Sequence, residues 1–400
     1  MKGTRRFPVW LLCVWGVTRL ALLFFVFKVW IFPGPDVTSD VSVIYHGWYE
    51  TLRTGTFPHE DVTWQYPPAA ALAILSPGLL PFLDYAQAFY ALAFVADLAV
   101  FCLLQFAGLR PGRTLRGAWA WTVGVALLGP TVYARYDLMV VAVAVAALLA
   151  GTRRPRVMGA LVGFGALLKV WPVLLLAGVV RRRAWVSAAA TAGGLALLFA
   201  LTMPGAFSFL TFQRDRGTEV ESLGSLVFHV ARHFGWEGRA MLHYGSVEFL
   251  GPYVDWVSAA ALFLSVIAFG WLLLWRLQVR HMTLQAVADA AFVAVLVFTV
   301  TSRVISPQYL VWLIGLAAVC LTVQGTTQRP VAVLVLLACA VTSIDYPLFF
   351  QSLIEGDGEA VAVMVLRNAL LVAATVLSCA RLWRAAGARW RRRPAAEPTR

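Results

Sequence analysis

Charged residues are scarce in this chain. Only 13% of its 400 residues are Asp, Glu, Lys or Arg, whereas an average soluble domain has about 25%. Hydrophobic residues make up 60% of the sequence, and the mean hydropathy is +0.75. Long apolar runs recur from one end of the chain to the other. This composition excludes a soluble globular enzyme and predicts an all-α membrane protein that crosses the bilayer many times.

Cysteines and metal-binding patterns are also few. The five cysteines all lie in apolar segments and none has a partner at C-x-x-C spacing, so neither a disulfide nor a metal cluster is expected. The chain lacks an Asp-x-Asp pair, with which metal-dependent transferases commonly hold the pyrophosphate of a nucleotide sugar. We therefore expect no metal and no cofactor.

The net charge of +13 comes from arginines in short clusters between apolar segments. Such clusters are typical of the cytoplasmic loops of membrane proteins. The sequence has no separate basic domain of the kind that binds nucleic acid. The expected partner of these charges is therefore the lipid bilayer and not a nucleic acid.

The alternation of apolar segments and arginine clusters predicts about twelve transmembrane helices with both termini in the cytoplasm of a multi-pass cell-membrane protein. We expect residues 1–383 to form a single membrane domain and 384–400 a basic cytoplasmic tail. Long extracytoplasmic loops, 33–82 and 204–254, are expected to carry short interfacial helices. Each half of the segment 157–180 is too short to cross a bilayer perpendicularly, which predicts a hairpin with Lys169 at its tip.

A polar stretch follows the first apolar segment and reads SDVSVIYHGWYETLRTGTFPHEDVTWQYPP, residues 39–68. Its Asp40 lies among apolar neighbours close to the expected membrane surface. A partly desolvated carboxylate there suits a general base. Asp40 or Ser39 also fits the N-cap of a helix over the following residues, and the two interpretations are compatible.

Several basic residues fall in expected outer loops, against the usual sorting of positive charge. A bound phosphate would explain the group, because guanidinium and ammonium ions bind phosphate with charge-assisted hydrogen bonds. For any single arginine, a salt bridge to a nearby carboxylate is the simpler interpretation. Inside the membrane, Arg19 and Asp97 are expected to pair with each other. The outer basic residues are Arg53, Arg135, Arg214, Arg216, Arg232, Arg239 and Arg303.

Four stretches together resemble a known family. The pattern S-D-x4-Y followed by W-Q-Y-P-P resembles the first outer loop of glycosyltransferase family 87, in the GT-C superfamily. Three more stretches are similar to that family, namely GALLKVWPVLLL (165–176), RGTEVES (216–222) and RVISPQYLVWL (303–313). They follow one another across nearly the whole chain, so the combination is specific although each stretch alone is weak.

The resemblance implies a GT-C membrane enzyme that uses a polyprenyl-phosphate sugar as its donor. It implies that Asp40 is the catalytic base, and Lys169 and Arg303 are the closest matches to the basic residues near the donor phosphate. The further candidates for substrate or donor-phosphate binding are Arg216, Glu221, Gln308, Arg135, Tyr45, His46 and Tyr66.

The expected function is transfer of a sugar, mannose first, to a hydroxyl of a glycolipid or cell-envelope glycan at the outer face. A single carboxylate acting on the acceptor implies inversion at the anomeric carbon. Arabinofuranose is the alternative sugar, and Glu221 or Asp137 is the alternative base. There are two rival functions. One is a lipid or polysaccharide transporter or flippase, and the other is a non-catalytic assembly subunit.

Overall fold

A computed structural model describes residues 8–214, 216–279 and 282–387. Most of the expected basic tail, 384–400, lies outside the described residues. α-Helices make up nearly all regular structure in the described part. Their bounds are α1 (Val9–Val26), α2 (His46–Arg53), α3 (Ala70–Leu75), α4 (Tyr85–Gly108), α5 (Arg116–Leu128), α6 (Asp137–Gly151), α7 (Pro155–Leu168), α8 (Arg182–Thr202), α9 (Phe209–Arg214), α10 (Leu226–Ala231), α11 (Val254–Gln278), α12 (Leu284–Thr301), α13 (Tyr309–Leu321), α14 (Arg329–Ser343), α15 (Phe350–Glu355) and α16 (Gly358–Gly387).

Short 3-10 and π-helical turns connect several of these helices. The two π-helical turns are η1 (Asp40–Tyr45) and η6 (Ile344–Leu348). The 3-10 turns are η2 (Ser76–Leu79), η3 (Pro130–Val132), η4 (Trp171–Leu176) and η5 (Arg232–Phe234). Helix α3 and η2 occupy the proline-interrupted segment, where prolines and short length prevent a full membrane crossing.

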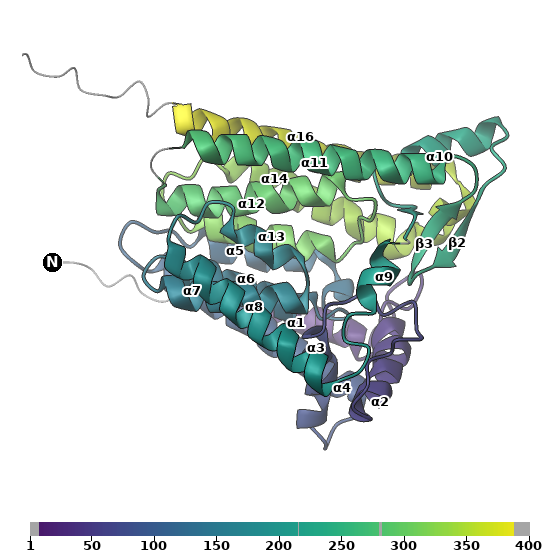
Figure 1. Ribbon diagram of the computed structural model, residues 1–400, viewed down its shortest axis with the longest axis horizontal. Helices are drawn as coiled ribbons and strands as arrows, with labels where there is room; N and C mark the ends of the chain where they lie inside the picture. The colour runs from purple at the N-terminus through teal and green to yellow at the C-terminus, as the bar shows by residue number, and fades with distance from the viewer. Residues whose placement is uncertain (1–7, 215, 280–281, 388–400) are drawn as a thin grey trace, which may run out of the picture.

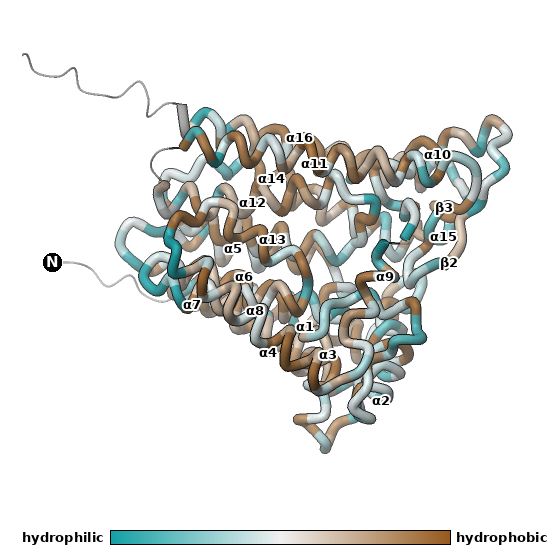
Figure 2. The backbone as a smooth tube through the Cα atoms, viewed as in Figure 1, coloured by the Kyte–Doolittle hydropathy of each residue, from teal (hydrophilic) through white to brown (hydrophobic). Residues whose placement is uncertain are grey.

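The long helices run side by side, and the polar connections collect at the two ends of the bundle. Figure 1 shows α11, α12, α14 and α16 along one side and α7 and α8 along the other. The strands lie at one end with α9 and α10, and α2 lies towards the same end. Hydrophobic colour follows the helices in Figure 2, whereas hydrophilic residues gather at both ends. This distribution is that of a protein whose middle layer faces hydrocarbon.

Helices α7 and α8 pack closely because α7 carries two glycines four residues apart. A Cβ atom on Gly159 would lie 2.1 Å from the carbonyl oxygen of Ala184, and one on Gly163 would lie 2.4 Å from that of Ala188. This is the small-residue packing that draws helices together in lipid, where no hydrophobic effect does so. The close pair fixes the end of α7, where Lys169 follows.

The prediction of an all-α membrane protein is confirmed in its coarse form. Within the described residues, six helices are long and apolar enough to cross a membrane: α1, α4, α8, α11, α14 continued by η6, and α16. Several other expected crossings correspond to shorter helices, such as α13 with 13 residues and α6 with 15. At about 1.5 Å per residue these span roughly 20 Å, less than the bilayer core of about 30 Å. The structure therefore does not establish the expected twelve crossings.

The second expected outer loop contains a small antiparallel sheet that the sequence analysis did not predict. Strand β3 (Ser246–Leu250) pairs with β1 (Thr218–Glu219) on one side and with β2 (Arg239–His243) on the other. Tyr244 and Gly245, both with positive φ, make the two-residue turn between β2 and β3. The short helices α9 and α10 lie in the same segment as this sheet.

The predicted pairing of Arg19 with Asp97 is confirmed. Arg19 Nε lies 2.8 Å from Asp97 Oδ2, and both side chains are buried. The Asp97 carboxylate also accepts hydrogen bonds from Trp121 Nε1 and Tyr133 Oη, each at 2.6 Å. One carboxylate thus connects α1, α4, α5 and the turn before α6, and a buried charge of this kind is tolerable only because it is fully paired.

Replacing Asp97 with Ala is expected to destabilise the fold strongly, because Arg19 would keep a buried charge without its partner. Breaking a buried pair costs about 3–5 kcal/mol. Thermal or denaturant unfolding of the purified protein in detergent measures the change.

The matched control is Glu50→Ala, which removes an exposed carboxylate 3.4 Å from Arg53. Exposed pairs contribute about 0–1 kcal/mol, so this variant is expected to unfold almost like the wild type. Equal losses in both variants would contradict the structural role assigned to Asp97.

Candidate active site

One cavity at the sheet end of the bundle brings the four sequence stretches together. It has a volume of about 380 Å³ and lies between the end of α7, the start of α13, α9, α11 and the β2–β3 turn. Five predicted substrate-binding residues line it: Tyr66, Lys169, Arg216, Arg303 and Gln308. These residues are far apart in the sequence, so their convergence is a result of the fold.

Lys169 is the central cation of this cavity. It follows the last residue of α7 in extended backbone, and its Nζ lies 2.7 Å from Asp137 Oδ1 at the start of α6. The same carboxylate oxygen accepts a hydrogen bond of 2.6 Å from Trp312 Nε1 on α13. Burial lowers the pKa of Lys169, while Asp137 opposes this shift by favouring the charged ammonium.

Four aromatic rings surround the Lys169 ammonium, with centroids 5.1 to 5.7 Å from Nζ. Their negative faces favour a cation that has lost its water. The ammonium, already paired with Asp137, is thereby held at the cavity wall, where it can also meet an anionic group of a ligand. The rings belong to Tyr66, Tyr136, Tyr309 and Trp312.

The loop that carries Arg303 is fastened to the sheet by Glu219. The Glu219 carboxylate accepts hydrogen bonds from the backbone N–H of Ile305 at 2.6 Å and from Ser306 Oγ at 3.0 Å. Its own N–H donates to the carbonyl of Arg303 at 3.0 Å. Burial raises the pKa of Glu219, and these hydrogen bonds act in the opposite direction. The stretches RGTEVES and RVISPQYLVWL are thereby joined.

The guanidinium groups of the cavity are themselves held in place. Arg303 donates through Nη2 to the carbonyls of Gln213 and Arg214. Arg216 Nε lies 3.2 Å from Glu248 Oε1 on β3. For Arg216 the simpler expectation, a salt bridge, is therefore correct, although the residue also lines the cavity.

Asp40 does not line the cavity. It is the first residue of η1, and its Oδ2 is 2.7 Å from Arg135 Nη2. The Asp40 side chain is 33% exposed, whereas that of Arg135 is 8% exposed. Arg135 also donates to the carbonyls of Val37 and Ala134. Burial opposes the charged form of Arg135, but Asp40 outweighs it and raises the pKa of the guanidinium.

The side-chain hydrogen bond expected of an N-cap at Ser39 or Asp40 is not observed. The Ser39 side chain makes no capping contact with η1. The Asp40 carboxylate instead faces Arg135 and remains accessible. That arrangement leaves the carboxylate available to a ligand.

Aromatic side chains connect Asp40 with the cavity. Tyr45, in the same turn as Asp40, lies 6.1 Å from Tyr136, and Tyr136 lies 5.2 Å from Tyr66 between ring centroids. Burial raises the pKa of Tyr66 to about 12, and the charges of Asp137 and Asp40 act in the same direction. Tyr66 is thus within electrostatic range of both carboxylates.

Two other predicted residues lie away from the cavity. His46 stacks on Tyr85 with a centroid distance of 5.0 Å and faces solvent. Glu221 is buried, with Oε1 2.6 Å from Arg367 Nη1 on α16. The same guanidinium lies 3.0 Å from Asp345 Oδ2.

Tyr136 and Trp312 were not predicted as site residues, and Asp137 was predicted only as an alternative base. Nothing in the local sequence distinguishes Tyr136 and Trp312 from other aromatic residues, because their role comes from contact with Lys169, which belongs to a different segment. The nearest signal was the placement of a carboxylate and an aromatic residue at the ends of apolar segments.

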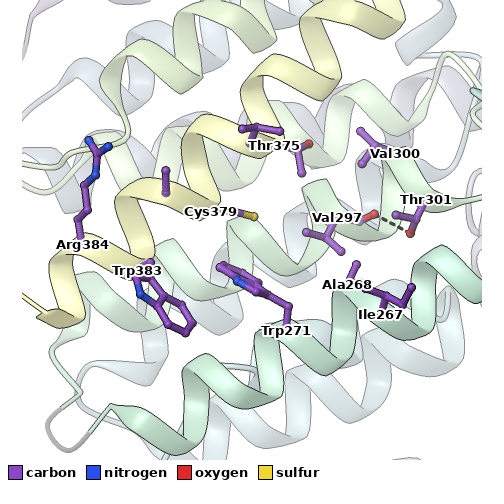
Figure 3. Close-up of a pocket in the computed structure, with 12 residues that line it drawn as sticks. Ile267, Ala268, Trp271, Val297, Val300, Thr301, Thr375, Cys379, Trp383 and Arg384 are labelled. Carbon is purple, nitrogen blue, oxygen red and sulfur yellow. Dashed lines mark hydrogen bonds between the residues drawn. The ribbon is translucent and has the colours of Figure 1, made fainter.

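A larger cavity of about 660 Å³ lies elsewhere, between α11, α12 and α16 (Figure 3). Its walls are almost entirely apolar, and Trp271 and Trp383 stack beside it with a centroid distance of 5.7 Å. Its one charged lining residue, among those the structure describes, is Arg384 at one end. The cavity contains none of the candidate site residues.

Comparison with known proteins gives one match. Residues 64–307, more than half of the chain, match the model of glycosyltransferase family 87. The matched region contains Tyr66, Lys169, Arg216 and Arg303, whereas Asp40 lies before it. No curated protein and no solved structure matched the chain.

Replacing Glu219 with Gln is expected to loosen the loop over 303–308. The neutral amide oxygen accepts more weakly than the carboxylate from the Ile305 N–H, and the Ser306 hydroxyl must turn to accept from the amide NH2, at a cost of about 1 kcal/mol. Hydrogen–deuterium exchange over 303–308 should rise in this variant.

Glu237→Gln is the matched control, since Glu237 is exposed in the same outer segment. Its exchange over 303–308 should equal that of the wild type. Unchanged exchange in the Glu219 variant would show that Glu219 does not fasten the loop.

Proposed function

Because the chain belongs to glycosyltransferase family 87, and is therefore a glycosyltransferase, we propose that it takes its sugar from a polyprenyl-phosphate donor. The acceptor is a hydroxyl of a glycolipid or cell-envelope glycan, and the reaction inverts the anomeric carbon. Mannose is the first candidate sugar and arabinofuranose the second.

The observation that carries this proposal is the composition of the cavity wall. Lys169, Arg216 and Arg303 provide cationic groups that suit a phosphate. Apolar side chains such as Leu262 and Phe298 line the same cavity and suit the start of a hydrocarbon chain. A sugar phosphate joined to a polyprenyl chain carries both chemistries in one molecule.

The proposed mechanism begins with the acceptor hydroxyl. Asp40 takes its proton, and the oxygen attacks the anomeric carbon while the bond to the donor phosphate breaks. The negative charge that develops on the leaving polyprenyl phosphate is stabilised by Lys169 and Arg303. Arg135 holds the Asp40 carboxylate in position. Attack from the side opposite the leaving phosphate gives inversion.

The proposed location of the site is the extracytoplasmic side of the cell membrane. Described loops at the opposite end of the bundle carry arginines such as Arg110, Arg153 and Arg181, which is typical of a cytoplasmic face. Both termini belong to that end in this proposal. A transporter or flippase remains the rival, and the family match counts against it.

Replacing Asp40 with Asn is expected to reduce sugar transfer by about 10²- to 10⁴-fold, since the amide cannot accept the acceptor proton. The measurement is transfer from labelled polyprenyl-phosphate mannose in membranes at matched expression. The arabinofuranosyl donor is tested alongside, so that the sugar and the base are assigned separately.

Glu60→Gln provides the matched control, because Glu60 is an exposed carboxylate of the same loop. It should retain full activity. Equal activity of the Asp40 variant and the wild type would remove Asp40 from the mechanism and direct attention to Asp137 or Glu221.

Replacing Lys169 with Met is expected to lower kcat/KM for the donor by about 10- to 100-fold, because the variant loses one hydrogen bond to the charged donor phosphate. Because the change also leaves Asp137 unpaired, the folded fraction is measured by size-exclusion chromatography. The double variant Lys169→Met with Asp137→Asn removes both charges.

The double variant should fold better than the Lys169→Met single variant but should have the same low activity. Recovery of activity in the double variant would show that Lys169 serves only to neutralise Asp137.

A further inference from the structure

The wall of the candidate active-site cavity has three chemically different parts. The cations Lys169 and Arg303 form one part and the apolar side chains of Leu262 and Phe298 another, and these suit the proposed phosphate and prenyl chain. The third part, here called the uncharged side, is mainly polar, and the proposed mechanism does not use it. It consists of Thr63, Gln65, Tyr244, Gly245 and Ser246.

The uncharged side is continuous because the β2–β3 turn lies against the loop that precedes α3. A Cβ atom on Gly245 would lie 3.4 Å from the Cβ atom of Thr63, which is ordinary van der Waals contact. Two segments far apart in the sequence therefore form one side of the cavity.

Charge next to the uncharged side is already balanced within the protein. Arg216 donates to Ser246 Oγ, and its Nε lies 3.2 Å from Glu248 Oε1. The buried Glu248 carboxylate also accepts a hydrogen bond of 3.1 Å from Ser246 Oγ and lies 3.2 Å from His243 Nδ1. Glu219 is a second buried carboxylate within interaction range of Arg216. A neutral group of the ligand therefore suits this side better than a second anionic group.

Tyr244 occupies a backbone position that favours other residue types. It is the first of the two central residues of the β2–β3 turn and has a φ of 46°. Asn, Asp or Gly is usual at this position, and a positive φ is uncommon for a bulky residue. The turn therefore does not account for a tyrosine, whereas a role at the cavity that Tyr244 lines would account for it.

Gln65 provides a hydrogen-bond acceptor on the same side. It lines the cavity and is only 6% exposed. Its Nε2 donates to the carbonyl of Val62, which fixes the amide, and its Oε1 is buried without a partner among the described residues. A buried acceptor without a partner is costly, and a hydroxyl of a ligand would remove that cost.

We propose that the uncharged side binds the sugar of the donor, with Tyr244 against the sugar and Gln65 Oε1 accepting a hydrogen bond from one of its hydroxyls. A sugar presents both C–H surfaces and hydroxyls, which an aromatic ring, a phenol and an amide complement. This inference rests on the proposed polyprenyl-phosphate donor. It makes Tyr244 and Gln65 the residues that distinguish the donor from the polyprenyl phosphate left after transfer.

The test compares two variants of the full chain that place Asn at a tyrosine with positive φ. Y244N changes the cavity wall, whereas Y253N changes an exposed tyrosine, with a φ of 68°, that does not line the cavity. Each protein is titrated in nanodiscs, without acceptor, with polyprenyl-phosphate mannose, polyprenyl-phosphate arabinofuranose and sugar-free polyprenyl phosphate. Thermal melting checks the fold, and sugar transfer by the wild type checks the proposed function separately.

Y244N should bind the donor that the wild type transfers about tenfold more weakly, because a hydrogen bond and a ring contact to the sugar are lost. Its affinity for polyprenyl phosphate should stay within about twofold of the wild type. Its melting temperature should equal or exceed that of the wild type, because Asn suits the turn. Y253N should bind every ligand as the wild type does, and Q65M should show the same selective loss as Y244N.

Equal weakening of the sugar-bearing and sugar-free ligands by Y244N, or no weakening of either, would overturn this inference and leave the proposed function standing if the wild type transfers sugar. A defect that appears only when acceptor is present would assign the uncharged side to the acceptor and would also overturn it. A wild type that neither binds nor transfers from either donor would contradict the proposed function, and this inference with it.

Discussion

The carboxylate of Asp137 is the constraint on which the candidate active site depends. One of its oxygens receives both the Lys169 ammonium and the Trp312 indole N–H. A charge buried this deeply is tolerated only with such partners, and its place at the first residue of α6 adds the favourable field of a helix N-terminus. Three segments distant in sequence are thereby fixed around one oxygen, and the lysine is presented to the cavity among aromatic rings.

The same principle recurs elsewhere in the bundle, because hydrocarbon offers no water to an unpaired charge. Arg19 and Asp97 connect α1 with α4, and Arg367 on α16 pairs with both Glu221 and Asp345. Tyr346, next to Asp345, lies within interaction range of Arg135, which holds Asp40. The ion pairs that stabilise the helices also determine where the loops place the candidate base.

Much of this architecture could be predicted from sequence, since apolar runs and arginine clusters report directly on membrane crossing. The pairing of Arg19 with Asp97 followed from the cost of isolated charge in lipid. The short β2–β3 hairpin was missed because strands of five residues leave little periodicity beside longer apolar segments. The roles of Tyr136 and Trp312 could not be found, because they arise from contacts between helices far apart in the chain.

The central claim is that the cavity around Lys169 holds the donor phosphate. It is tested most directly by photo-crosslinking the wild-type protein with a polyprenyl-phosphate analogue that carries a diazirine on the isoprene unit next to the phosphate. If the cavity holds the donor phosphate, peptides that contain Val170, Leu262 or Val304, which line it, become labelled, and labelling falls when natural donor is added. Labelling confined to the apolar cavity between α11, α12 and α16 would contradict it.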